Sequence, residues 1–550
     1  MALDEIYAGP WKRALGHADN KVYIHPSAAT AERPQKTLIS CPRGWYDAGD
    51  YTKYIVNSGI TCYTLLAIYE HFREYADSLV LHIPENRNGL PDLLDEILWN
   101  LRWMLTMQDP NDGGVYHKLT SPEFCGFVMP DQDKLACWVV QKSTAATLDF
   151  AAVTAQAFRV YRDHLPSFAD SCLSASLAAW NWARLHPDEL YDQNAMNALF
   201  SSRINTGAYG DSNVSDEWDW SAMELFVTTG QDSFLQTADA FDRPQPAVPG
   251  WGSVRTLGFF TLLHHRKNIP AGSVDTLALK NNFFNFANGL RSEWMNSAYG
   301  VAMGKSNGDF DWGSNSVAAN QGMALIQAFL VSRDSTYLWA ALSNLDYMLG
   351  RNATTYCFIT GWGGKSPMNI HHRQSGSDRV KEPVPGFLAG GPNPGQQDGC
   401  SGYPSDLPAR SYVDAQCSYA SNENAINWNA PFSYLACAME ALLSPAGLPD
   451  KSSVKHRKTP VPDCLNLVQA YPNPFNANAV IQFSLARPAW LNMAVYDAAG
   501  RLVSEPVLKT RFAAGMHQVP FPGGGLPSGI YMIRIQAGDE AKTGKMVLVK

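Results

Sequence analysis

The spacing of apolar residues changes its period once along this 550-residue chain, close to residue 443. Before that point, runs such as 58–76 repeat apolar residues every three or four positions, which is the period of a helix with one buried face. After it, segments such as 480–485 alternate apolar and polar residues, which is the period of a strand. The sequence therefore predicts a mainly α protein with a smaller β part at its C-terminal end.

About ten helices are predicted in the first 443 residues. Ser143 is the predicted N-cap of a helix that runs to Leu165, and acidic residues follow Pro91 at the start of another helix. The other predicted helices are 169–185, 216–229, 252–266, 275–295, 316–332, 335–349 and 424–443. No clear strand-like segment interrupts them. Ten helices without a repeat of fixed length favour a helical barrel with variable loops over a simple bundle or a solenoid.

The C-terminal part is predicted to be a separate domain. Residues 444–470 contain Pro, Ser and Lys with almost no periodicity, which indicates a linker. Residues 471–550 contain alternating runs separated by turn residues, which indicates a small β-sandwich. This segment has a net charge of +4 and the rest of the chain −12, so the two domains differ electrostatically.

Composition excludes several classes of protein. The net charge of −8 argues against a nucleic-acid partner, because binding phosphates needs clustered positive charge. No apolar run approaches the roughly 20 residues that cross a bilayer. The first residues lack the basic and apolar regions of an export signal, so we expect a mature sequence or one whose signal has been removed. The ten cysteines form no CxxC pair, which disfavours zinc and leaves disulfides open.

The segment 44–51, GWYDAGDY, holds two carboxylates three residues apart. Its small residues let the backbone turn tightly, so that Asp47 and Asp50 could act on one water molecule. On spacing alone, a helix-entry or calcium loop is an equal alternative.

Two later segments carry further candidates. His371 and Arg373 are two apart in a glycine-rich segment, so on extended backbone both side chains point the same way and would suit hydroxyl or carboxylate recognition. Glu423 begins a helical segment among Tyr, Trp and Asn residues. A carboxyl group in that partly apolar setting should have a raised pKa, which a general acid requires. For each segment alone, a structural role is the commoner one.

Together these segments resemble the family 9 glycoside hydrolases, the cellulase family with an (α/α)6 barrel. The resemblance covers about residues 10–443. Its landmark blocks are 44–59, 90–118, 142–153, 385–398 and 403–431. One position departs from the family pattern, since Cys357 stands where Ser, Thr or Val is usual.

The resemblance implies hydrolysis of β-1,4-glucan with inversion. Asp50 would be the general base that activates water, Asp47 would hold the same water, and Glu423 would be the general acid. His371 and Arg373 would contact the sugar. Asp414 would support the site, and the candidate aromatic platforms are Trp45, Trp138, Trp312, Trp362, Tyr419 and Trp428. For any single aromatic residue, core packing is the commoner role.

The resemblance assigns no cofactor to the chemistry and leaves a structural calcium ion open. Segment 209–217 is similar to the family's calcium-binding turn, with Asp216 and Glu217 as candidate ligands. Members that bind calcium often add a distant Asp, and 249–253 lacks one. Zinc is disfavoured because Cys125 and Cys137 have only His117 nearby.

The predicted function is therefore an endo-β-1,4-glucanase that acts on a β-glucan such as cellulose, carboxymethylcellulose or mixed-linkage glucan. Exo-acting members (cellobiohydrolase, β-glucosidase or exo-glucosaminidase) are the alternative within the fold. A non-catalytic glucan-binding barrel is disfavoured because all three carboxylates are present. A six-hairpin sugar epimerase would share the architecture but not these motifs.

The tail, from YPNPF at 471 onward, resembles the sorting domains of type IX secretion. That resemblance implies contact with secretion machinery and a secreted or cell-surface bacterial protein. An accessory β-domain or a carbohydrate-binding module is the alternative, and Trp490 alone gives too little aromatic surface for the latter. The landmark blocks are most similar to those of a subgroup that carries an immunoglobulin-like domain before the barrel, and we expect that domain to be missing from this sequence.

Overall fold

The structure is a computed structural model of the whole chain. It describes residues 2–86, 88–238, 246–304, 308–444, 465–498, 500–537 and 540–550. The chain divides into two compact units, Met1–Pro449 and Asp450–Lys550. Most of the predicted linker, residues 445–464, lies outside the described residues.

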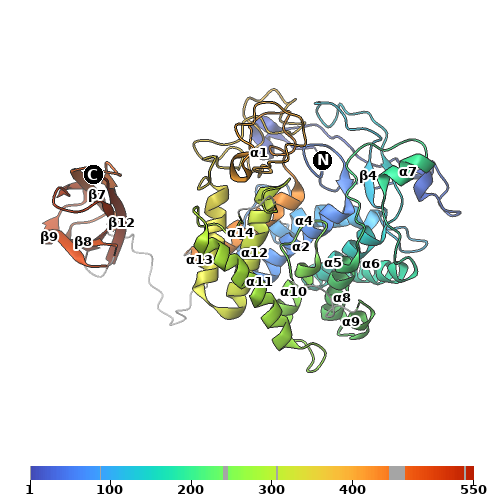
Figure 1. Cartoon of the computed structure of the whole chain (residues 1–550), viewed down its shortest axis with the longest axis horizontal. Helices are drawn as coiled ribbons and strands as arrows, with labels where there is room; N and C mark the ends of the chain where they lie inside the picture. The colour runs from blue at the N-terminus through green and yellow to red at the C-terminus, as the bar shows by residue number, and fades with distance from the viewer. Residues whose placement is uncertain are drawn as a thin grey trace. The chain divides into compact units, whose positions relative to one another are not determined.

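Six helices form a closed ring in the first unit. They are α2 (Ile55–His71), α5 (Thr144–Tyr161), α8 (Ser215–Thr229), α10 (Arg255–His265), α12 (Ser314–Ser332) and α14 (Ile426–Leu443). Each contacts the next in chain order, and α14 contacts α2 to close the ring, so early and late parts of the unit lie side by side (Figure 1). Helices α2 and α5 are buried on almost every side, as expected for helices with neighbours all round.

A second set of helices packs outside this ring. It consists of α4 (Asp92–Thr106), α6 (Pro166–Leu185), α9 (Ser233–Ala238), α11 (Thr276–Asn296) and α13 (Ser335–Met348). Helix α11 buries only Leu279, Phe283, Ala287 and Leu290, a stripe with helical spacing that leaves its other face in solvent. Inner and outer helices together confirm the predicted helical barrel. The short helices of the unit are α1 (Glu5–Ala8), α3 (Arg73–Ser78) and α7 (Gln193–Leu199).

Local signals placed several helix ends correctly. The hydroxyl of Ser143 accepts a hydrogen bond from the backbone N–H of Ala146 at 3.3 Å, so Ser143 is the N-cap of α5. The run 58–76 was predicted as one helix, and it is two, α2 and α3. The backbone leaves the helical conformation at Phe72, a local break that apolar spacing does not reveal.

A small sheet in the first unit contradicts the expectation of no strands there. Its order is β2-β1-β5-β4-β3, from strands β1 (Val22–Ile24), β2 (Leu38–Ile39), β3 (Lys53–Tyr54), β4 (Lys118–Thr120) and β5 (Trp138–Val139). Strands of two or three residues are too short to show a period of two. Strands β3 and β4 are antiparallel and place Tyr54 opposite Lys118.

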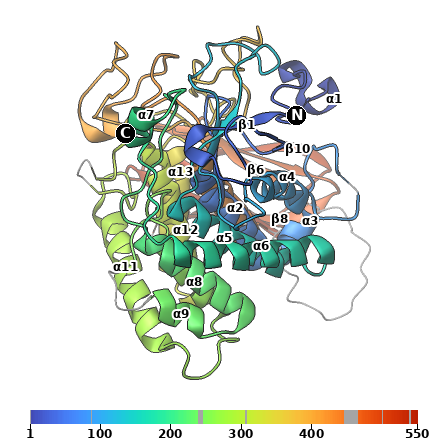
Figure 2. The same cartoon turned by 90° about the vertical axis from the view of Figure 1, so that its right-hand side faces the viewer.

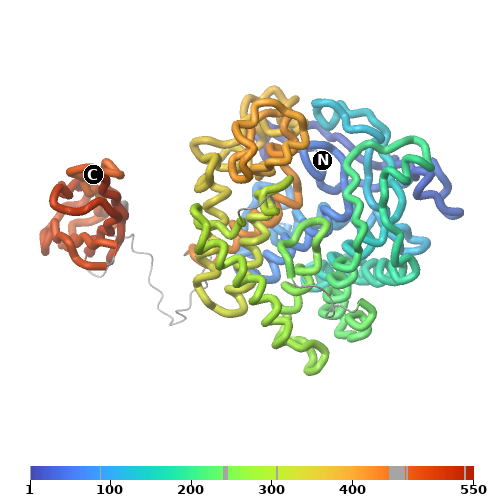
Figure 3. Tube along the Cα trace, viewed as in Figure 1, coloured from blue at the N-terminus to red at the C-terminus, as the bar shows by residue number. Residues whose placement is uncertain are grey.

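Long loops gather at one end of the helices. Figures 2 and 3 show the orange segment that precedes α14 at the same end as the cyan segment between α4 and α5. Within the orange segment, a disulfide joins Cys400 to Cys417.

The second unit has two antiparallel sheets that share one hydrophobic core. One sheet has the order β10-β7-β6 and the other β12-β11-β8-β9. The strands are β6 (Leu465–Tyr471), β7 (Asn478–Leu485), β8 (Ala489–Asp497), β9 (Leu502–Phe512), β10 (Gly515–Pro522), β11 (Gly529–Ala537) and β12 (Glu540–Leu548). Alternate residues Ile481, Phe483 and Leu485 of β7 are buried, which confirms the small β domain.

The predicted end of the linker at residue 470 was too late. Strand β6 begins at Leu465, whose side chain is buried in the core of the second unit. Its short apolar run follows residues rich in Lys and Pro, so the sequence pattern did not separate it from the linker. No helix in the described parts of the chain is long and apolar enough to cross a membrane.

Candidate active site

The loop 44–51 holds Asp47 and Asp50 beside the start of α2. The backbone C=O of Asp47 accepts a hydrogen bond from Ile426 N–H of α14 at 2.8 Å, and its carboxylate accepts one from Asn57 Nδ2 of α2 at 2.7 Å. Asp50 accepts hydrogen bonds from the backbone N–H and the hydroxyl of Thr52. Two inner helices therefore hold Asp47, and a local turn holds the carboxylate of Asp50.

Glu423 lies against the same loop, just before α14. Its Oε1 accepts a hydrogen bond from Gly49 N–H at 3.2 Å. Its backbone C=O accepts one from Gly390 N–H at 2.8 Å, and its backbone forms a bridge with that of His371. The fold thus brings together three segments that are far apart in the sequence.

The segment 371–373 completes this group. Arg373 donates its backbone N–H to Gly49 C=O at 2.9 Å and its Nε–H to Cys125 C=O at 2.9 Å. His371 Nδ1 lies 2.6 Å from Gln416 C=O, so Nδ1 carries a proton and Nε2 is left as an acceptor when the ring is neutral. Both side chains line one cavity, as their spacing predicted.

Burial away from water is the largest cause of the pKa shifts of Asp47 and Glu423. It raises the pKa of Asp47 to about 7, with the negative charge of Asp50 adding to the shift and hydrogen bonds from Asn57 and Tyr209 opposing it. Desolvation, followed by the charge of Asp50, raises the pKa of Glu423 well above its usual range. A raised pKa favours the protonated form of Glu423, which is the form that a general acid requires.

The cavity that these residues line has a volume of about 1180 Å³. Its aromatic lining residues are Tyr54, Phe124, Tyr209, Trp251, Trp312, Tyr419 and Trp428. The rings of Trp312 and Tyr419 are 5.6 Å apart at an angle of 35°. Acid and base groups set among flat apolar faces suit a substrate of linked sugar rings. Trp312, Tyr419 and Trp428 thus lie where we predicted.

Three other predicted aromatic platforms do not line this cavity. Trp45 donates its Nε1–H to Glu96 at 2.8 Å and lines a different cavity of about 1010 Å³. Trp138, in β5, packs on Tyr23 with ring centroids 4.9 Å apart. Trp362 is 63% exposed outside the cavity. These three residues are close in sequence to predicted site residues or motifs, but that closeness did not predict whether their rings line the cavity.

Asp414 supports the site rather than lining it. Its carboxylate accepts hydrogen bonds from the backbone N–H groups of Met368 and Asn369 at 2.9 and 2.8 Å, and from Asn422 Nδ2 at 3.2 Å. These bonds join the segment before His371 to the segment before Glu423. The supporting role of Asp414 stays a prediction, and these are the contacts through which it would act.

Tyr209, Phe124 and Trp251 line the cavity but were not predicted as site residues. Tyr209 lines the cavity together with Asp47, and its effect on the pKa of Asp47 opposes the rise that burial causes. Tyr209 lies in the segment that we compared with a calcium-binding turn, and nothing in its neighbours indicates that this turn reaches Asp47.

The predicted calcium ligands lie at the start of α8. Asp216 accepts a hydrogen bond from Val254 N–H at 2.7 Å, whereas Glu217 Oε2 and both carboxylate oxygens of Asp149 are buried without a partner. Burial and mutual repulsion raise the pKa of Asp149 and Glu217 well above their usual range. Asp149, on α5, is a further acid near the turn that sequence reasoning did not identify.

These orphaned oxygens fit a hard cation with oxygen ligands. However, no three His, Cys, Asp or Glu side chains within the described ranges are positioned to hold a metal ion as they stand. Calcium at Asp216 and Glu217 therefore stays a prediction.

Comparison with known proteins identifies both units. Residues 4–436 match Glycosyl hydrolase family 9. The chain belongs to glycoside hydrolase family 9. Residues 469–550 match a secretion system C-terminal sorting domain. The chain is thus a glycoside hydrolase with a sorting domain, as its motifs predicted.

Two curated relatives illustrate this membership. A xyloglucan-specific endo-beta-1,4-glucanase of Bacteroides ovatus is 46% identical over 447 residues, which cover 80% of this chain and 76% of the relative. Endoglucanase D of Acetivibrio thermocellus is 35% identical over 406 residues, which cover 73% and 61%.

Solved structures agree with the fold. A family 9 structure from Bacteroides ovatus has a TM-score of 0.76 at 44% identity and covers 80% of both chains. A thermostable endoglucanase from Alicyclobacillus acidocaldarius has a TM-score of 0.72 at 30% identity, with the same coverage. These neighbours confirm the α/α barrel.

Proposed function

We propose that this protein is an endo-β-1,4-glucanase that cleaves internal glucosidic bonds with inversion. The observation that carries the proposal is the contact between Glu423 and the Asp47–Asp50 loop through Gly49, inside one aromatic-lined cavity. This contact holds the Glu423 carboxyl group beside the loop that carries the two aspartates, which supports a reaction that uses one acid and one base.

In the proposed reaction, Glu423 transfers its proton to the glycosidic oxygen as the bond from that oxygen to C1 breaks. A water molecule attacks C1 from the opposite face and gives its proton to Asp50, while Asp47 holds the same water. The C1–O bond electrons stay with the departing oxygen, which Glu423 has protonated. The product therefore has the opposite configuration at C1.

The substrate is proposed to be a polymeric β-1,4-glucan, with xyloglucan tested first. The relative that is 46% identical over most of this chain is described as xyloglucan-specific. Cellulose and carboxymethylcellulose are the unbranched alternatives. The sorting domain supports secretion, and so action on polymers outside the cell or at its surface.

We also propose that calcium binds beside Asp216 and Glu217, with Asp149 nearby. Calcium there would neutralise buried carboxylates and so stabilise the junction of α5 and α8. It would supply no group to the reaction.

The test pairs viscosity loss with reducing-end release on xyloglucan and carboxymethylcellulose, for wild type and Glu423→Gln. A steep fall in viscosity per bond cut, absent in the variant, supports internal cleavage by this site. Abundant small sugars with slow viscosity loss would instead favour an exo-acting enzyme. Absence of any release from either polymer would contradict the proposed substrate class.

Glu423→Gln should retain more activity on an aryl glycoside whose leaving group needs no protonation. Proton NMR during the first turnovers should show the α-anomer of the product first, because the β-bond is inverted. An initial β-anomer would contradict inversion.

A further inference from the structure

Lys118, in strand β4, is a buried lysine without a carboxylate partner. Its side chain is fully buried, as is that of Lys53, and Lys142 is nearly so. Lys53 pairs with Asp19 at 2.6 Å, and Lys142 pairs with Asp109 and with a second acid. Across the described parts of the chain, no carboxylate oxygen lies within 4.0 Å of Lys118 Nζ. Lys118 therefore differs from the other two in how its charge is compensated.

Three uncharged oxygen atoms accept hydrogen bonds from the ammonium group of Lys118. Its Nζ donates to Gln193 Oε1 at 2.6 Å, to Gly207 C=O at 2.6 Å and to Thr206 Oγ1 at 3.2 Å. An ammonium group has three N–H donors, so this set satisfies the charged form. Burial lowers the pKa of Lys118 to about 7, and the negative charge of Asp50 opposes that shift. In mildly acidic solution Lys118 is charged.

A continuous set of contacts joins Lys118 to Asp50. Tyr54 lies opposite Lys118 across the β3–β4 pair, and Lys118 Nζ is 5.4 Å from the centre of the Tyr54 ring. The Tyr54 hydroxyl is 3.0 Å from Thr52 Oγ1, which hydrogen bonds to the Asp50 carboxylate. The ammonium group and the carboxylate thus share one buried network, where charges act more strongly than in water.

We infer that Lys118 is a positioning residue whose unpaired charge keeps Asp50 in its carboxylate form during catalysis. This inference rests on the proposed role of Asp50 as the base. Its physical reason is that a buried positive charge without an ion pair stabilises the nearest anion of the network. Neutral hydrogen-bond partners hold that charge in place without cancelling it.

Other charged or titratable groups also face this network, and the test must leave them unchanged. Around Asp50 they are Asp47, Tyr54, Cys125, Tyr209, His371, Arg373 and Glu423, and around Lys118 they are Tyr54, His117 and Tyr191. Arg373 is another cation near these acids. It is unchanged in all the variants described below, so its effect on them is the same in each.

The sharpest variant is Gln193→Glu, which places a carboxylate on the Lys118 ammonium group without removing the lysine. It should cancel the charge of Lys118 and move the acidic limb of the kcat/KM profile to higher pH by about one unit. Asn194→Glu, one residue later on α7, is the matched control. Its exposed side chain adds the same charge, and it should leave that limb in place.

Lys118→Met removes the charge and should also move the acidic limb of the kcat/KM profile to higher pH. Lys118→Arg keeps the charge, so its acidic limb should stay at the wild-type pH even if the variant is slower. A purely structural role predicts a lower rate or melting temperature in these variants with an unmoved limb. That outcome would overturn the inference.

A measurement independent of activity separates this inference from the proposed function. Subtracting the infrared spectrum of Asp50→Asn from that of the wild type isolates the band of the protonated Asp50 carboxyl group. The intensity of this band against pH gives the midpoint of the titration. The midpoint should rise by about one pH unit in Gln193→Glu relative to Asn194→Glu. An equal midpoint in both would overturn the role of Lys118, whether or not the protein cleaves glucan.

Discussion

Glu423 Oε1 accepts a hydrogen bond from the backbone N–H of Gly49 at 3.2 Å, although 374 positions separate the two residues in the sequence. The same glycine accepts a hydrogen bond from Arg373 N–H through its C=O. Gly49 therefore joins Glu423, the segment 371–373 and the loop of the two aspartates. Its two hydrogen bonds hold these three segments close together.

Gly49→Ala should abolish most of the activity. A Cβ atom at Gly49 would lie 2.0 Å from His371 C=O and 2.9 Å from Glu423 Oε1, so the two segments must separate. Displacements of about 1 Å can cost about 100-fold in rate. Gly364→Ala is the control, because a Cβ there meets nothing within 4 Å. Equal kcat/KM for both variants would contradict the role assigned to Gly49.

Asp50→Asn should lower kcat by 100-fold or more, the usual contribution of a general base. Added azide should restore turnover, because it attacks C1 without needing a base, and the product should be an α-glycosyl azide. Asp47→Asn should cost less, since Asp47 only holds the water. The rates of both variants should be measured with and without azide. If Asp50→Asn turns over without azide, Asp47 and not Asp50 is the base.

Cys417→Ser should weaken substrate binding and lower stability. The Cys400–Cys417 disulfide closes a loop whose residue Gln416 contacts His371. A closed loop of this length contributes about 3 kcal/mol by the chain-entropy argument. We expect a higher KM and a lower free energy of unfolding than in Cys437→Ser, which removes a free cysteine. A KM equal to that of the control would separate the loop from substrate binding.

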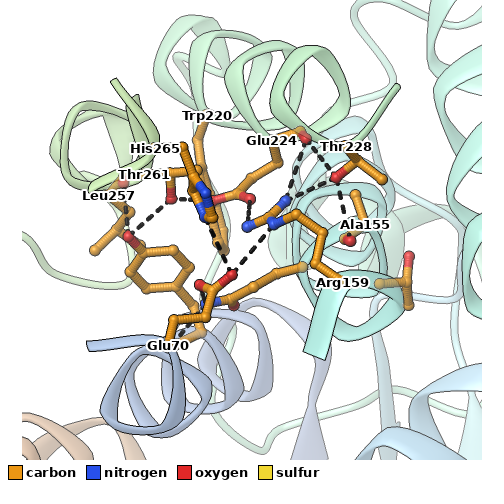
Figure 4. Close-up of polar contacts among 12 residues, drawn as sticks. Glu70, Ala155, Arg159, Trp220, Glu224, Thr228, Leu257, Thr261 and His265 are labelled. Carbon is orange, nitrogen blue, oxygen red and sulfur yellow. Dashed lines mark hydrogen bonds and ion pairs between the residues drawn. The ribbon is translucent and has the colours of Figure 1, made fainter. Parts of the chain in front are cut away.

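Arg159→Met should destabilise the barrel. Arg159 of α5 lies between Glu70 of α2, at 3.2 Å, and Glu224 of α8, at 2.7 Å (Figure 4). Removing one member of a buried ionic network leaves charge uncompensated and costs about 3–5 kcal/mol. Urea unfolding at pH 7 measures this change. Arg162→Met, which removes an exposed arginine of the next turn, is the control.

The same network predicts how stability changes with pH. Burial alone would raise the pKa of Glu70, but Arg159 and then His265 outweigh it, so that pKa lies well below its usual range. A depressed carboxyl pKa contributes stability above the unfolded-state value of about 4.3, which is lost as the pH falls below it. The free energy of unfolding should therefore decline less steeply between pH 5 and about pH 3 in Glu70→Gln than in wild type.

Calcium should raise the melting temperature of chelator-treated protein. Neutralising the buried carboxylates of Asp149 and Glu217 favours the folded state, by an amount that increases with ion concentration. Glu217→Gln should lose most of this response, while glucan cleavage by the calcium-free protein should continue at low temperature. Melting curves that coincide with and without calcium would contradict the calcium proposal.

Much of the site could be predicted from short-range patterns. Asp47, Asp50 and Glu423 lie in short motifs that left a structural role open one by one and pointed to a site only when they were read together as a family pattern. Ser143 caps α5 through a contact three residues away. The small strands β3 and β4 could not be predicted, because two or three residues carry no period. Trp45 was placed wrongly for a related reason, since its hydrogen bond to Glu96 depends on a helix elsewhere in the chain.

Residue types and their local spacing were enough to predict a helical barrel and a β tail, and the resemblance of the motifs to a family pattern gave the candidate groups of the site. Only the folded chain brought Glu423 to Gly49, placed Tyr209 in one cavity with Asp47 and buried Lys118 with no carboxylate oxygen of the described residues within 4.0 Å. The physical reason is range. Caps, periods and motifs act over a few residues, whereas burial and charge compensation depend on which distant segments the closed ring of helices brings into contact.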